Sequence, residues 1–168
     1  MNIVYPKDYS ATSIQRLVDI ADSDILFLGD PRVKIEPGPR MFDRIAQVMR
    51  ETGGGWVYAD AAGHPRIDYQ RGSIRDGFDF GPVVGVSVQT ARQSGVDGTW
   101  KWGGLYNLRL RISEKHAVVR IPEPLYSASL IDARPTGQKQ FDYVDPRNRD
   151  YQIEMERVAT AHLKRIGA

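Results

Sequence analysis

The chain has 168 residues, of which 23 are Lys or Arg and 21 are Asp or Glu, so its net charge is +2. This near balance argues against a dedicated nucleic-acid or membrane-surface protein, because such proteins usually concentrate basic charge. The lack of cysteine excludes disulfides, thiolate metal sites and a cysteine nucleophile, and it fits a reducing cytosol. The first residues lack an apolar core of signal-peptide length, and no apolar run is long enough to span a membrane. We therefore expect one cytoplasmic domain.

Apolar residues in the first third of the chain alternate between the spacing of strands and the spacing of helices. Short apolar runs predict strands, and apolar residues three or four positions apart predict helices. The expected elements are a strand at 3–5, a helix at 14–21, a strand at 25–28, a helix at 41–49 and a strand at 56–58. Strands that alternate with helices favour an α/β sheet.

The rest of the chain has a more mixed order of elements. Residues 61–80 are polar and aromatic without regular spacing, which predicts a long surface loop of the kind that often carries function. The elements expected after it are a strand at 83–87, a short helix at 90–95, a helix at 105–113, a strand at 117–121, a turn at 122–124, an edge strand at 125–130, an extended polar segment at 133–149 and an amphipathic helix at 151–166 capped by Asp150.

This order predicts an α/β fold with a mixed, partly parallel sheet and helices on both faces. Residues 1–132 are expected to form the core. Residues 133–168 are expected to form an extended segment and a C-terminal amphipathic helix, which would lead into any further domain.

Two carboxylates follow predicted strands. Asp30 comes after the strand at 25–28, and Asp60 comes after the strand at 56–58. Ligands of α/β sheets bind beyond the carboxyl ends of the strands, where carboxylates can hold a divalent metal that bridges a diphosphate. Asp30 is therefore a candidate metal ligand and Asp60 a candidate substrate-binding residue. The alternative is that Asp30, which precedes Pro31, only starts a turn.

The segment 68–80 interleaves carboxylates, arginines and aromatic residues. Aromatic rings can cover the apolar C–H face of a sugar, while carboxylates and arginines bond its hydroxyl groups. Asp68 and Arg75 are therefore candidate substrate-binding residues, and Trp100 and Trp102 add two further aromatic faces. The alternative is a polar loop that is held to the sheet by internal salt bridges.

Several segments resemble family 2 glycosyltransferases, which have the GT-A fold. The run DILFLGD at 24–30 resembles the strand that ends in the family's Asp-x-Asp metal motif, and WGGLYNLRLR at 102–111 is similar to the helix that carries its Glu-Asp catalytic pair. More narrowly, IDYQRGSIRD at 67–76 and KQFDYVDP at 139–146 resemble a Bacteroides-type group of glycosyltransferase-like proteins. In that group, a domain like this one precedes a second, fuller glycosyltransferase domain.

The resemblance implies a shortened GT-A fold and a role in glycosyl transfer, with two departures from an active member. Most of the family's nucleotide-binding half is missing, and Gly103-Gly104 stand where the family has its Glu-Asp pair. Glycine cannot take the proton of the acceptor hydroxyl. We therefore expect an accessory or acceptor-binding module that binds a carbohydrate or nucleotide-sugar, with a fused or associated glycosyltransferase domain as its partner.

The alternative is an active, divergent, metal-dependent glycosyltransferase that uses a nucleotide-sugar donor. Asp30 and Asp60 would then hold the metal-bound donor, with Mn²⁺ or Mg²⁺ as the cofactor, and Asp76 or Asp79 would be the catalytic base. A shortened sheet would also expose an edge strand that can pair with a second copy of the chain. A homodimer is therefore a further expectation.

Overall fold

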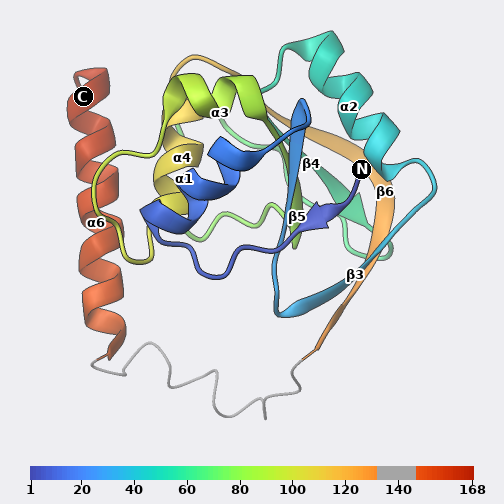
Figure 1. Cartoon of the computed structure of the whole chain (residues 1–168), viewed down its shortest axis with the longest axis horizontal. Helices are drawn as coiled ribbons and strands as arrows, with labels where there is room; N and C mark the ends of the chain where they lie inside the picture. Colours follow the sequence, from blue (N-terminus) through green and yellow to red (C-terminus); the bar gives the residue numbers. More distant parts are fainter. Residues whose placement is uncertain (132–146) are drawn as a thin grey trace.

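A computed structural model describes residues 1–131 and 147–168, and these residues contain one six-stranded sheet (Figure 1). Its strands are β1 (Ile3–Val4), β2 (Ile25–Gly29), β3 (Val33–Pro37), β4 (Trp56–Ala61), β5 (Val83–Ser87) and β6 (Val118–Leu130). Their order across the sheet is β1-β2-β5-β4-β6-β3. β1 is parallel to β2 and β4 to β6, whereas the other neighbours are antiparallel. The predicted α/β class with a mixed, partly parallel sheet is confirmed.

Helices cover both faces of this sheet. The described helices are α1 (Ala11–Ile20), α2 (Met41–Thr52), α3 (Val88–Ser94), α4 (Gly104–Ser113) and α6 (Arg147–Ile166). Buried side chains of α1, α3 and α4 pack on one face, and those of α2 pack on the other. α6 lies outside these layers, against α4 (Figure 1). Within the described ranges, no helix combines the length and the apolar character that crossing a membrane requires.

Glycines set two features of the packing between α2 and the sheet. Gly53 ends α2 in the left-handed region, with φ at 66°, a conformation that glycine adopts without strain. A Cβ on Gly85 of β5 would lie only 2.6 Å from Cγ2 of Ile45 in α2. The missing side chain therefore allows α2 to approach the sheet closely.

Two predictions about the strands were wrong. β3 was not predicted, and it pairs with the second half of β6, so the segment 125–130 is an inner part of the sheet and not an edge strand. The turn predicted at 122–124 lies inside β6, where the register against β4 shifts between Ile121 and Pro124. A bulge of this kind accommodates prolines, since they cannot donate to a regular ladder.

The edges of the sheet are short or charged. β1 has two residues, and β3 carries an exposed ion pair in which Lys34 Nζ lies 2.8 Å from Glu36 Oε1. Short and charged edge strands oppose pairing with another chain. The homodimer stays a prediction.

The C-terminal helix begins earlier than predicted. α6 starts at Arg147, so Asp150 lies in its first turn and does not cap it. The predicted extended segment at 133–149 is therefore helical from residue 147, and its remaining part, with the motif at 139–146 and the predicted boundary at 132, lies outside the described residues. Met155 and Val158 of α6 are buried against Tyr106 and Leu110 of α4.

Candidate functional site

The long segment between β4 and β5 packs on the same face of the sheet as α1, α3 and α4. It has no helix and no strand of the main sheet, as predicted, and we call it the 62–82 loop. Its aromatic residues lie against β4, with ring centroids 5.1 Å apart for Tyr58 and Phe80 and 6.1 Å apart for Tyr58 and Phe78. Tyr69 joins them at 5.5 Å from Phe78. The loop is therefore anchored by aromatic packing.

Arg109 of α4 binds the backbone of the 62–82 loop. Its side chain is buried, and its guanidinium donates hydrogen bonds to the carbonyl oxygens of Ser73 (2.9 Å) and Arg75 (2.7 Å). The guanidinium also lies 5.7 Å from the ring centroid of Tyr69 and 5.0 Å from that of Tyr106. Carbonyl oxygens and aromatic faces thus replace a carboxylate as the surroundings of this cation.

A cavity of about 280 Å³ lies between the 62–82 loop, α4 and α6, and we call it the aromatic pocket. Tyr9, Trp102, Tyr106 and Tyr151 are among its aromatic walls. Its lining also includes Asp76 from the loop and Arg32, which follows β2, so opposite charges accompany the rings.

The phenols of the pocket remain protonated near neutral pH. Burial raises the pKa of Tyr106 to about 12, with a further contribution from Asp76. Burial also raises the pKa of Tyr9 and of Tyr151. Tyr106 donates its hydroxyl proton to the carbonyl of Ile74, whereas no described residue is hydrogen-bonded to the hydroxyls of Tyr9 and Tyr151. These two hydroxyls can therefore bond to a ligand.

α6 fixes the position of Trp102 in this pocket. Oε1 of Glu154 accepts hydrogen bonds from the backbone N–H groups of Trp102 (2.7 Å) and Gly103 (2.8 Å) at the start of α4. The rings of Trp102 and Tyr151 lie edge to face, 6.2 Å apart. The pocket is complete only when α6 is in place, because Tyr151 and Met155 both belong to that helix.

Asp30, the predicted metal ligand, is bound by a neighbouring arginine. Arg32 donates from Nε to Oδ1 (3.0 Å) and from Nη2 to Oδ2 (2.7 Å), and its backbone N–H also donates to Oδ1 (2.9 Å). Burial opposes ionisation of Asp30, but Arg32 outweighs it and lowers the pKa of this carboxyl. Within 1–131 and 147–168, no three His, Asp or Glu residues are grouped as a metal-ion site. A metal at Asp30 stays a prediction.

Asp60 is also held by an arginine. Arg120 of β6 donates to both carboxylate oxygens of Asp60, at 3.0 and 2.8 Å, and the backbone N–H of Arg66 donates to Oδ1 at 2.8 Å. Arg120 is the main cause of the lowered pKa of Asp60, and burial acts against it. Asp68 is 83% exposed and contacts the same guanidinium at 3.1 Å. These two predicted substrate-binding residues form an ion-pair network that holds the 62–82 loop to β6.

The two predicted catalytic residues line different cavities. Asp76 lines the aromatic pocket, whereas Asp79 lines a separate cavity of about 360 Å³ together with Asp30 and His64. Asp79 is paired with Arg66 and accepts a hydrogen bond from the N–H of Gly81 at 2.9 Å. The two predicted catalytic carboxylates therefore do not share a cavity, whereas Asp79 and the predicted metal ligand Asp30 do.

The remaining predicted residues divide between the pocket and the scaffold. Trp102 lines the aromatic pocket. Trp100 packs against the cluster of Tyr106 and Leu110, and the structure does not place it in the pocket lining. Arg75 has an exposed side chain, and its contact with α4 is made by its carbonyl oxygen. Of the predicted site residues, the structure brings Asp76 and Trp102 together in the aromatic pocket, Asp30 and Asp79 together in the separate cavity, and Asp60 and Asp68 together on Arg120.

The two glycines that stand at the family's Glu-Asp position are enclosed. A Cβ on Gly104 would lie 2.5 Å from the backbone nitrogen of Ala11, and a Cβ on Gly103 would lie 2.9 Å from Cγ2 of Val158. The start of α1 and the side of α6 thus occupy the space that a side chain would need. A carboxylate at either position would require these elements to move.

Sequence reasoning missed several residues of the pocket. Arg109 lies four positions after Leu105, on the apolar stripe of the predicted helix, and this spacing could have indicated its burial. Arg32 directly follows the Asp30-Pro31 pair and could have been considered as a partner for that carboxylate. Tyr9 and Tyr151 come from opposite ends of the chain, so only the folded structure brings them together.

Along the chain, β2 is followed by β3, α2 and β4, so a strand that was not predicted separates β2 from the helix. This order is common to many α/β proteins and does not identify a family. No protein-family model matches the chain, and no curated protein matches it in sequence.

Proposed function

We propose that this domain binds a carbohydrate in the aromatic pocket, as an accessory or acceptor-binding part of a protein involved in glycosyl transfer, and that it does not itself catalyse the transfer. The observation that carries the proposal is the convergence of Trp102, Tyr106 and Tyr151 beside Asp76 in one cavity. Aromatic rings pack on the C–H faces of sugars, and a carboxylate accepts hydrogen bonds from their hydroxyls.

The charges near the sheet favour binding over catalysis. Asp30 and Asp60 are each bound through both oxygens by an arginine, so neither carboxylate is free for a metal-bound diphosphate. Asp76 is the one carboxylate among the described residues that line the aromatic pocket. A transferase needs a base for the acceptor and a means of stabilising the leaving diphosphate. Asp76 could supply the first, whereas the arginines of the lining, Arg32 and Arg109, are already bonded to Asp30 and to carbonyls of the 62–82 loop.

The test is calorimetric titration of the full chain with chitotetraose, cellotetraose, mannotetraose and a hexuronate oligosaccharide. We expect one of these sugars to bind, and Trp102→Ala to weaken its binding by about tenfold or more, because a stacked ring is lost. Trp100→Ala is the matched control, since Trp100 lies in the same segment but outside the pocket lining. Equal affinities for the folded wild-type and Trp102→Ala proteins would contradict the proposal.

Titration with UDP-sugars and GDP-sugars, with and without Mn²⁺, addresses the alternative of an active transferase. Under the proposed function we expect no metal-dependent binding. Metal-dependent binding that Asp30→Ala abolishes would instead favour a metal-dependent glycosyltransferase.

A further inference from the structure

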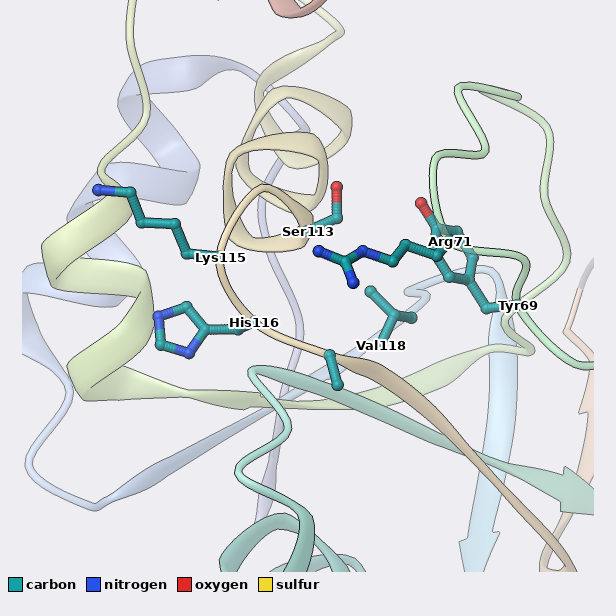
Figure 2. Close-up of a pocket in the computed structure, with 7 residues that line it drawn as sticks. Tyr69, Arg71, Ser113, Lys115, His116 and Val118 are labelled. Atoms are coloured by element: carbon teal, nitrogen blue, oxygen red, sulfur yellow. The ribbon is translucent and has the colours of Figure 1, made fainter. Parts of the chain in front are cut away.

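A second cavity, of about 240 Å³, lies where α4 ends and β6 begins, beside the 62–82 loop (Figure 2). The residues of its lining that matter here are Tyr69, Arg71, Ser113, Lys115, His116 and Ala117. Three of these side chains are basic or can be protonated, and none of the described residues of the lining carries a carboxylate. We call this cavity the basic pocket.

Several hydrogen-bond donors of the basic pocket are unused. Within residues 1–131 and 147–168, no hydrogen bond or ion pair joins the side chains of Arg71, Lys115 or His116 to another residue. The backbone N–H of Ala117 likewise has no acceptor in that part of the chain, although its carbonyl accepts from Gly55 at 3.0 Å. Arg71, Lys115 and Ala117 are exposed and His116 is half-buried, so these donors face solvent and are available to a ligand.

Figure 2 shows how these groups approach the turn between α4 and β6. The guanidinium of Arg71 reaches from the loop toward Ser113 and Val118, at the start of β6. Lys115 and His116 leave the turn on its other side, and the ammonium of Lys115 extends away from Arg71. The flexible four-carbon stem of a lysine allows its charge to turn toward a bound anion.

We propose that the basic pocket binds a tetrahedral oxyanion, the phosphate or sulfate group of a ligand. The fork of a guanidinium matches two oxygens of such a group, and the backbone N–H of Ala117 can bond a third. Among the residues that the structure describes, no carboxylate of the lining neutralises this positive charge. This site is separate from the aromatic pocket, and the inference does not depend on carbohydrate binding there.

The competing explanation is that these cations only stabilise the end of α4. A helix C-terminus carries partial negative charge, which favours basic residues nearby. Under that explanation, replacing Arg71 would change stability slightly but would have no effect that depends on phosphate. Under the oxyanion proposal, phosphate binds saturably and requires Arg71.

The test follows the backbone amides of His116 and Ala117 by ¹H–¹⁵N NMR during titration with inorganic phosphate, sulfate and glucose 6-phosphate, at ionic strength held constant with NaCl. We expect saturable shifts at these amides, and Arg71→Gln to weaken binding by about tenfold or more. Arg16→Gln is the matched control, because it removes the same charge from an exposed position on α1. A well-dispersed NMR spectrum confirms that each variant is folded, and Lys115→Gln gives a second, independent loss of charge.

Shifts that do not saturate, or that are equal in the wild-type, Arg71→Gln and Arg16→Gln proteins, would overturn the proposal. Tighter binding of glucose 6-phosphate than of inorganic phosphate would support an ester as the ligand. Equal binding of the two would support the free ion.

Discussion

At the residue scale, Asp60 couples the stability of the fold to pH. Its pKa is lowered, mainly by Arg120, so the ionised carboxylate favours the folded state. The stabilisation is present above the unfolded pKa of an aspartate, about 4, and is lost as the pH falls through the lowered pKa. Acid therefore weakens the link between β4 and β6.

We expect Asp60→Asn to lower the free energy of unfolding by about 2 kcal/mol at pH 7, because Arg120 loses its main partner but keeps Asp68. The variant should also lose less stability than the wild type when the pH is lowered from about 5 to about 2. Urea unfolding across this range measures both effects, with Asp22→Asn, at an exposed carboxylate, as the control. Parallel pH curves for the wild type and Asp60→Asn would show that Asp60 does not carry the coupling.

The sequence predicted where the two strand-end aspartates lie but not what they contact. Asp30 follows β2 and Asp60 is near the end of β4, and these strands run in the same direction because both are antiparallel to β5. The partner of Asp60 depends on the register of β4 against β6, which pairs Tyr58 with Arg120. That register is set by packing of the whole sheet, so the residue pattern alone could not reveal the ion pair.

At the element scale, Glu154 makes α6 part of the cap of α4. Its Oε1 accepts from two N–H groups that begin α4, at Trp102 and Gly103, where Gly103 itself offers no side-chain cap. Capping by a carboxylate satisfies donors that have no partner within the helix and complements the positive end of the helix.

We expect Glu154→Ala to lower the free energy of unfolding by about 1–2 kcal/mol, which is the usual cost of losing a cap. Hydrogen exchange of the Trp102 and Gly103 amides should become faster in this variant. Glu156→Ala is the control, since it removes an exposed carboxylate from the same helix. Unchanged exchange at the two amides would mean that the cap contributes nothing to holding α6 on α4.

Strand prediction failed where proline rules were applied too strictly. Pro122 and Pro124 predicted a turn, yet β6 passes through them with a shift of register against β4. β3 was not predicted, although Val33 and Ile35 alternate with charged residues in the manner of a strand. The helices were placed better, because their apolar spacing extends over more residues.

At the scale of the whole molecule, α6 and the sheet should unfold together. α6 buries Val158 and Met155 against α4, and ion pairs join its Arg165 to Glu114 (2.9 Å) and Asp97 (3.3 Å). We expect the urea transitions followed by tryptophan fluorescence and by far-ultraviolet circular dichroism to coincide. A helical transition at lower urea than the fluorescence transition would show that α6 is an independent unit.

The aromatic pocket shows the limit of sequence reasoning at this scale. Asp76 and Trp102 were predicted as site residues from the local mixture of charges and rings. Tyr9 and Tyr151 could not be predicted, because each reaches the pocket through the packing of α1 and α6 around α4. The local composition indicated a site with charged and aromatic residues, and the tertiary structure determines which of these residues line it.

The position of β3 at the edge of the sheet has a consequence for the kinetics of folding. Val33 pairs with Leu130, so the two strands are joined by a chain of roughly a hundred residues, and the entropy of closing so long a loop opposes their early association. During synthesis, β3 leaves the ribosome long before β6, its neighbour in the sheet, has been made. Until then β3 is unpaired, with the apolar residues Val33 and Ile35 lacking their strand partner. A chaperone that binds exposed apolar segments would be expected to act on this part of the nascent chain.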